Sequence, residues 1–169
     1  TNTTADPELV SWITAARQYA ETFTHRSLIT TTWDLKLDGF PRCGDLWLPR
    51  APLVSVTSVS YLDTAGATQT WAATNYSVDA PVGAEAGPGR VISGYGIFYP
   101  STYGVPNCVT VRFVAGYGAA ALVPDGIKAA MKLLIGHWWM NREAVIVGTI
   151  SSTAPLAVDS LLWPYKVWS

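Results

Sequence analysis

The stretch "GIKAAMKLLIGHWWMNREAV", residues 126–145, has the spacing of a helix but very few charges for one. Its charged residues are Lys128, Lys132, Arg142 and Glu143. Pro124 and Asp125 precede the stretch and suit the start of a helix. When successive residues are placed 100° apart, apolar side chains fall on both sides. The stretch therefore predicts a long apolar helix that needs packing partners on more than one side.

The two sides of this predicted helix differ in composition. One side collects Ile127, Ala130, Leu134, Trp138 and Val145, and we expect it to cover the sheet or the first helix. The other side mixes charges with apolar side chains: Lys128, Lys132, Ile135, Trp139, Arg142 and Glu143. That mixture predicts a subunit interface, with Trp139 as the anchor and the charges as the rim. The alternative is a solvated stripe that carries one isolated Trp.

The composition also favours a subunit of an assembly. Charged residues make up 14% of the 169 residues, against about 25% in an average soluble protein. The chain has eight Trp and eight Tyr, which are enriched at interfaces because they join a large apolar area to a polar tip. A Trp-rich core is the alternative explanation. The net charge of −1 shows no basic excess, so general nucleic-acid binding through phosphates is not indicated.

The first third of the chain predicts a helix followed by short strands. Residues 6–25 form an amphipathic helix that Asp6 caps. Residues 29–37 alternate between apolar and polar side chains, which indicates a half-buried strand. A short strand at 45–48 and a hairpin follow, and the hairpin has strands at 54–61 and 68–71, a turn at 63–66 and a bulge near residues 57–58.

The remainder adds further strands and the second helix. Strands are predicted at 76–79, 90–92 and 109–115, with a Gly- and Pro-rich loop region at 80–107. Residues 156–162 predict one or two helical turns. The fold class is α+β: an amphipathic N-terminal helix, an antiparallel β-rich block, a long apolar helix and an extended C-terminal tail. We expect one domain over residues 1–155, with the β-rich insertion at about 29–115, and a C-terminal tail at 156–169.

Catalytic and metal-binding patterns are missing from the sequence, so we expect no enzyme, no cofactor and no metal. His25 ends the first predicted helix, and His137 and Asn141 are expected to form a hydrogen-bonded structural pair. The carboxylates are scattered, and only folding could bring His137 to one of them. Cys43 and Cys108 are expected to be reduced thiols in the core. No run of about 18 apolar residues lacks charge, so no membrane-spanning helix is expected.

Several blocks of the sequence occur in an order that resembles one family. They include "ITAARQYAETFTHRSLITTTWDLKLDGFP", "LPRAPLVSVTSVSYLDTAGATQTWAATNYSVD", "PGRV", "VTVRFVAGYG", "VPDGIKAAMKLLIGHWWMNREAV" and "PLAVDSLLWPYKV". The chain resembles the head–tail connector, or adaptor, proteins of tailed bacteriophages over nearly its whole length. Related adaptors occur in gene transfer agents.

The resemblance implies a structural protein of the virion, assembled in the host cytoplasm. Such proteins form a homo-oligomeric ring, commonly a dodecamer, beneath the portal protein at the head–tail junction. A stopper or tail-completion protein binds the far side, and DNA passes through the central channel without sequence-specific binding. The resemblance makes the C-terminal segment a portal-docking tail: Leu161, Leu162, Trp163, Pro164, Tyr165, Lys166, Val167 and Trp168. The alternative is a tail that packs on its own domain.

Two other functions remain open at this stage. The chain could be a neighbouring neck protein, for head closure or tail completion. It could also be a small aromatic-rich β binding module for a glycan or a host surface. Exposed aromatic side chains within residues 94–103 would favour the binding module.

Overall fold

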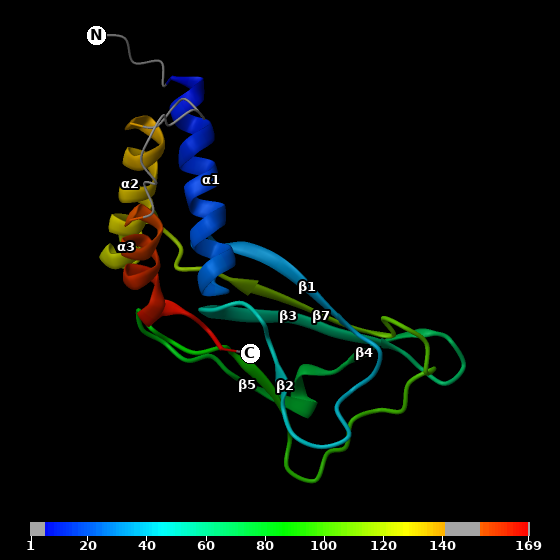
Figure 1. The fold of residues 1–169 in the computed structure, drawn as a ribbon. Coiled ribbons are helices and arrows are strands. Elements are labelled where there is room, and N and C mark those ends of the chain that lie inside the picture. Colours follow the sequence, from blue (N-terminus) through cyan, green and yellow to red (C-terminus); the bar gives the residue numbers. More distant parts are fainter. Residues whose placement is uncertain (1–5, 141–152, 169) are drawn as a thin grey trace.

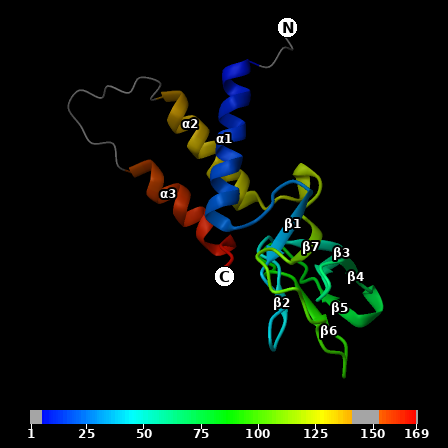
Figure 2. The same ribbon diagram turned by 90° about the vertical axis from the view of Figure 1, so that its right-hand side faces the viewer.

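The computed structural model describes residues 6–140 and 153–168. Within these ranges the fold has three α-helices, α1 (Pro7–Thr24), α2 (Asp125–Met140) and α3 (Thr153–Leu162). The helices gather at one end of the molecule and the strands at the other (Figures 1 and 2). All described strands lie between α1 and α2 in the sequence. The predicted α+β class is confirmed.

The larger sheet has the strand order β1-β7-β3-β4 and is antiparallel throughout. Its strands are β1 (Thr31–Leu37), β3 (Leu53–Leu62), β4 (Thr68–Trp71) and β7 (Val109–Ala115). The register of β3 on β7 shifts between Val56 and Ser58, so the predicted bulge is present, and it shifts again between Leu53 and Ser55. Strand β7 lies inside the sheet because it pairs with β1 on one side and β3 on the other, and its side chains at alternate positions are buried.

The smaller sheet consists of β2 (Leu46–Trp47), β6 (Arg90–Ser93) and β5 (Tyr76–Asp79), in the order β2-β6-β5. The predicted strand at 76–79 has the predicted bounds. The main core involves side chains from both sheets, including Val59, Val91 and Phe113. Aromatic rings pack against this core, and Phe40 lies 5.1 Å from Tyr99, centroid to centroid. Part of the high aromatic content is therefore core.

A second core holds the three helices together. Its buried residues include Ala16 and Ala20 from α1, Ile127 from α2 and Leu162 from α3. Small alanines let the helices approach closely. The Tyr19 hydroxyl of α1 donates a 2.7 Å hydrogen bond to Asp159 of α3, and this bond is the main cause of the raised pKa of Tyr19. Among the described helices, none is long and apolar enough to cross a bilayer.

Two features of the predicted fold are wrong. The long apolar helix is absent: the described part of α2 has 16 residues, and Lys132, Leu133 and Gly136 on it are exposed. The reason is that α1 and α3 are the main elements packed on α2 among the described residues, and side chains on another side of the helix stay exposed in the protomer. The extended tail is also wrong, because residues 153–165 form α3 and a 3₁₀ turn, Trp163–Tyr165. Val158 and Leu162, four residues apart, bury one face of α3.

Candidate assembly surfaces

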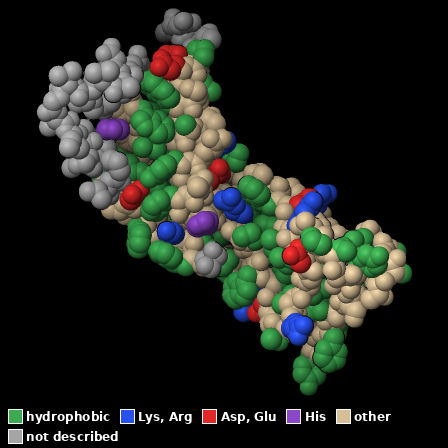
Figure 3. Space-filling model, turned by 45° about the vertical axis from the view of Figure 1, so that its right-hand side comes forward, with side chains coloured by type: hydrophobic (Ala, Val, Ile, Leu, Met, Phe, Trp, Pro, Cys, Tyr) green, Lys and Arg blue, Asp and Glu red, His purple; other side chains and the backbone are tan. Residues whose placement is uncertain are grey.

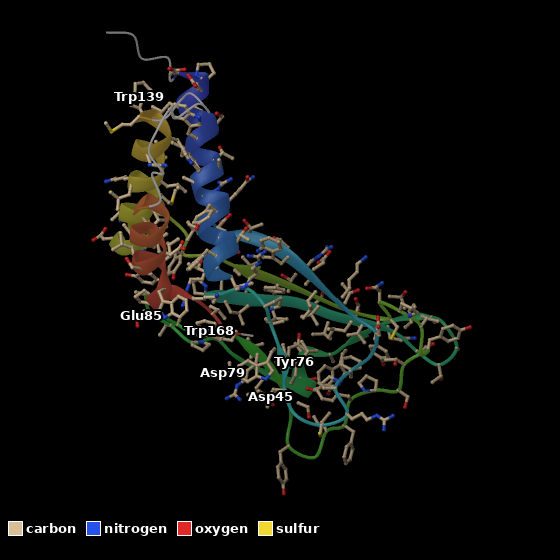
Figure 4. All side chains as sticks on the ribbon, viewed as in Figure 1. Asp45, Tyr76, Asp79, Glu85, Trp139 and Trp168 are labelled. Carbon is tan, nitrogen blue, oxygen red and sulfur yellow. The ribbon has the colours of Figure 1, made fainter. Side chains whose placement is uncertain are left out.

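The end of α2 remote from the sheets carries Trp139, which Figure 4 places at that end of the helices. Its ring meets the Trp12 ring of α1 edge to face, with centroids 5.6 Å apart and an interplanar angle of 85°. Trp139 nevertheless remains 49% exposed, and Met140 beside it is 85% exposed. Trp12 thus supports one edge of Trp139 while much of its surface is open to a partner. Such a supported aromatic is a suitable interface anchor.

The other residues predicted at this interface have different environments in the protomer. Ile135 packs against the helical core and is partly buried. Lys128 forms a 2.8 Å ion pair with Asp125 one turn earlier, and Lys132 is exposed. Arg142 and Glu143 lie outside the described residues. Trp139 contacts α1 and is also half exposed to solvent.

The opposite side of α2 behaves largely as the pattern predicts. Ile127 and Ala130 are fully buried and Leu134 nearly so. Trp138 is partly buried against the same core. Val145 lies outside the described residues. The helix therefore uses this side for its own core, as expected.

The C-terminal segment after α3 is fastened to the end of α1. The Val167 amide donates a 2.9 Å hydrogen bond to the Thr24 carbonyl, and the Arg26 Nε donates to the Tyr165 carbonyl. Leu162 and Val167 are 0% and 5% exposed. These predicted docking residues thus bury themselves in the protomer. The segment is short, but it belongs to the folded domain.

Two aromatic rings of this segment remain outside. Trp163 and Trp168 are 57% and 64% exposed, and their ring centroids lie 5.3 Å apart. The Lys166 ammonium lies over both rings, 5.6 Å from the Trp163 centroid and 4.5 Å from the Trp168 centroid. Figure 4 places Trp168 at the junction of helices and sheets, far from Trp139. The molecule therefore has two separate exposed Trp surfaces.

An apolar hollow of about 410 Å³ lies beside Trp168. Its lining residues come from β2 and its flank, from the loop before β6 and from the C-terminal segment: Trp47, Leu48, Pro49, Pro88, Val167 and Trp168. No ionisable side chain is among them. The hollow is large enough for an aromatic side chain of a partner. The hollow could not be predicted from local sequence patterns, because three segments that lie far apart in the sequence build it.

A network of charges braces the smaller sheet next to the hollow. Arg90 donates to Asp45 at 2.7 Å and to Asp79 at 2.9 Å, and so ties together β2, β6 and β5. The hydrogen bond to Asp79 is the largest cause of the raised pKa of Arg90. The guanidinium also lies 5.2 Å from the Trp47 ring centroid. Figure 4 shows Asp45 and Asp79 near Tyr76 on this sheet. Trp47 is therefore held in a fixed position at the hollow.

At the end of the β-block remote from the helices, apolar side chains project into solvent (Figure 3). In the loop after β6, Tyr95 is fully exposed and Phe98 is 89% exposed. The loop is ordered by hydrogen bonds: the Gly94 amide donates to Asn75, the Ile97 amide to Gly94, and the Ser93 hydroxyl to Ile97. We call Tyr95 and Phe98 the aromatic knob. Exposed aromatic side chains within residues 94–103, named above as a feature that would favour a binding module, are thus present.

An exposed ion pair links two strands of the larger sheet. Arg112 of β7 donates two hydrogen bonds to Asp34 of β1, at 2.8 and 2.7 Å, and the two residues are register partners. The bond to Arg112 is the main reason why the pKa of Asp34 lies below its usual value. Gln69 and two backbone amides act similarly on Asp63 in the hairpin turn. Both carboxylates therefore stabilise the fold in their charged form.

These pairs predict acid-sensitive stability. A carboxyl with a lowered folded-state pKa adds stability above its unfolded pKa, about 3.9, and that contribution disappears as the pH falls through the folded pKa. We expect urea unfolding midpoints to fall between pH 6 and pH 3, and to fall less in Asp34→Asn. Added salt should reduce the difference because the pair is exposed. An acid response in Asp34→Asn equal to that of the parent would contradict this assignment.

The histidine and cysteine residues considered in the sequence are the remaining candidates. His25 is the C-terminal cap of α1 in the left-handed conformation, with φ of 55°. Asn141 lies outside the described residues, so the predicted His137–Asn141 pair stays a prediction. Cys108 is buried, but the prediction of a core position is wrong for Cys43, which is exposed on a loop between two prolines. In the part of the chain that the structure describes, no cluster of three potential metal ligands occurs.

Three solved structures that this chain resembles come from gene transfer agent (GTA) particles. A chain in the neck of a native GTA particle, computed with C12 symmetry, superposes with a TM-score of 0.74 and 26% identity, covering 97% of this chain and 84% of that chain. A chain in the virion of a native GTA particle gives a TM-score of 0.76 at 24% identity, covering 98% and 80%. A chain in the neck of an empty particle, computed with C6 symmetry, gives 0.75 at 24%, covering 100% and 82%.

This chain is similar, over nearly its whole length, to neck proteins of gene transfer agent particles. This similarity confirms the resemblance found in the sequence at the level of a neck component of a phage-like particle. No protein-family model and no curated protein matches the chain.

Proposed function

We propose that this chain is a structural protein of a virion neck, and specifically a ring-forming head–tail adaptor. In this role it docks under the portal protein and joins it to a stopper or tail-completion protein. The observation that carries the proposal is the similarity, across 97% of the chain, to a chain in a neck with C12 symmetry. A dodecameric ring at the head–tail junction is the corresponding assembly.

The distribution of exposed apolar residues supports a ring subunit. Every subunit of a cyclic ring contacts one neighbour with one surface and the next neighbour with a different surface. The chain has separate exposed surfaces at Trp139, at Trp163 with Trp168, and at the aromatic knob. A ring docked at both ends needs four contacts, two to neighbours and two along the axis. Several separate apolar surfaces on one small chain fit this requirement better than a single binding site does.

The predicted docking tail keeps its role in the proposal, in a changed form. Leu162 and Val167 hold the segment on its own domain, which leaves Trp163 and Trp168 to contact the portal. Exposed, closely spaced Trp side chains are typical binding hot spots. The low net charge of −1 suits a channel through which DNA slides.

Mass photometry tests the ring directly. We expect the purified chain to form a ring by itself at high concentration or upon addition of portal-bearing heads, with a mass near twelve subunits. Monomers alone, both with and without portal-bearing heads, would rule out the proposed function.

A neighbouring neck position, for head closure or tail completion, is the second candidate, because the similar chains come from the neck as a whole. Cryo-electron microscopy of the assembled particle separates the two candidates by which ring touches the portal. The exposed knob is also the feature named above for a glycan-binding module. Glycan binding by the monomer that is lost in Tyr95→Ser would favour the binding module.

A further inference from the structure

The aromatic knob is a preformed projection. The Gly94–Ile97 turn is closed by a 2.9 Å hydrogen bond from the Ile97 amide to the Gly94 carbonyl, and Gly96 has φ of +72°. Ile97 packs against the main core, so the turn is anchored while Tyr95 points away. A backbone turn that is already ordered loses little conformational entropy on binding. The geometry is that of a group that inserts into a partner.

The chemistry of the knob defines the receiving site. Residues 91–107 contain no Asp, Glu, Lys or Arg. Arg42 lines one surface hollow together with Phe98, whereas Tyr95 is not part of that lining and is fully exposed, so Tyr95 is the uncharged anchor of the knob. A receiving site should therefore be apolar and free of buried charge, because an unpaired charge there would be costly. The apolar hollow beside Trp168 has these properties. Its volume of about 410 Å³ accommodates one large aromatic side chain with room to spare.

The knob and the hollow lie toward opposite ends of one strand. Pro88, just before β6, lines the hollow, and Tyr95 follows β6. Seven residues of extended chain at about 3.3 Å each separate them by roughly 20 Å. Figure 1 shows the loop after β6 at the far end of the β-block, away from the C-terminal segment. A knob cannot therefore enter the hollow of its own chain.

We propose that the aromatic knob of one copy inserts into the apolar hollow of a neighbouring copy. This inference rests on the proposed ring. A contact between two different surfaces of identical chains is heterologous, and repetition of one such contact closes a ring when the rotation allows it. The C12 symmetry of the neck that contains a similar chain requires this type of contact. Tyr95, with Phe98 beside it, is the inserted anchor, and Trp47, held by Arg90, is the wall that receives it.

A mixing experiment tests the contact. The knob variant Tyr95→Ser/Phe98→Ser keeps a hollow, and the hollow variant Trp47→Ser keeps a knob. We expect each variant alone to weaken self-association by at least about tenfold, since central aromatic anchors dominate interface affinity. An equimolar mixture should form two-subunit species, because one contact remains between a knob and a hollow, and should stop there. Tyr103→Ser, a change at an exposed Tyr in the same loop region, is the matched control and should assemble normally.

Cross-linking in assembled rings identifies the partner. A photoreactive phenylalanine analogue at position 95, in an isotopically labelled chain mixed with unlabelled chain, should cross-link to residues 47–49 or 88 of the other copy. Rings without this cross-link, or cross-links to the portal or to another neck protein instead, would overturn the inference and leave the ring intact. A failure to form rings with the parent chain would instead refute the proposed function. Near-ultraviolet circular dichroism confirms that each variant is folded.

Discussion

Gly116→Ala is expected to destabilise the fold by about 2–6 kcal/mol, a large share of the 5–15 kcal/mol that stabilises a typical domain. Gly116 ends β7, and its φ of +140° is a conformation that residues with a side chain rarely adopt. A Cβ atom there would lie 2.5 Å from the Ile29 carbonyl oxygen and 2.7 Å from Thr30 Cα. Both obstacles are backbone atoms of the two residues that directly precede β1. Relief therefore requires moving a strand rather than rotating a side chain.

Gly118→Ala is the matched control for this prediction. Gly118 also has a positive φ, +91°, but the nearest atom to its added Cβ is Leu122 Cδ1 at 3.7 Å, an ordinary contact. Only the backbone cost applies, so we expect about 1–2 kcal/mol. Urea unfolding of both variants, followed by tryptophan fluorescence, measures the difference. Equal losses of stability in the two variants would mean that the contact with β1 does not govern the effect.

The strands and helix starts were predictable because they depend on local patterns. Alternation gave β1 and β7, and the turn chemistry of Asp63 to Gly66 gave the β3–β4 hairpin. Asp6 accepts a hydrogen bond from the Glu8 amide, as its position before the first helix indicates. Each of these signals involves residues within a few positions of one another. Local physics therefore decides these elements with little help from the tertiary fold.

Strand order and the C-terminal structure could not be predicted in the same way. Strand β1 pairs with β7, so Trp33 lies opposite Phe113, and no local pattern reports such a distant pairing. The tail was expected to be extended because it is short, yet its fastening depends on Thr24 and Arg26 at the end of α1. The second helix was also predicted to need packing partners on more than one side, because the sequence does not locate α1 and α3 around α2. Contacts between distant segments account for each of these differences.

The candidate surfaces also differ in whether local sequence could predict them. The sequence singled out Trp139 and the terminal Trp residues by composition, and the structure leaves all three exposed. The aromatic knob was detectable as two aromatic residues in a Gly-rich, uncharged segment, and it was noted only as a test for a binding module. The hollow was not detectable, because β2, the loop before β6 and the C-terminal segment meet only in the folded chain. Projections are thus easier to infer from sequence than the sites that receive them.

Leu162→Ala is expected to cost about 2–5 kcal/mol, whereas Trp163→Ala/Trp168→Ala should cost little stability and abolish portal docking. Leu162 is 0% exposed in the helical core, so its truncation leaves a cavity between the helices. Trp163 and Trp168 are more than half exposed, and loss of such side chains usually changes stability by less than about 1 kcal/mol. Trp168 also lines the apolar hollow that is proposed to receive a neighbour's knob, so the ring mass is measured for the same variant. Loss of docking by rings of normal mass assigns the two Trp residues to the portal, whereas loss of the rings assigns Trp168 to the hollow. Thermal unfolding and co-sedimentation with portal-bearing heads measure stability and docking.

These point variants separate an effect on portal docking from an effect on folding more clearly than a truncation of the tail would. Removal of residues 161–169 would delete Leu162 and Val167 from the core together with the two exposed Trp residues, so a loss of docking could follow from a loss of folding. The double Trp variant keeps the hydrogen bond from Val167 to Thr24, and hence the position of the segment. Phe23→Leu removes another ring that Lys166 covers, together with the stacking of that ring on Tyr19 of α1, and controls for a loosened Lys166. Normal docking by a folded double Trp variant would remove the tail from the proposed portal contact, while unimpaired stability of Leu162→Ala would contradict the packing of α3 in the helical core.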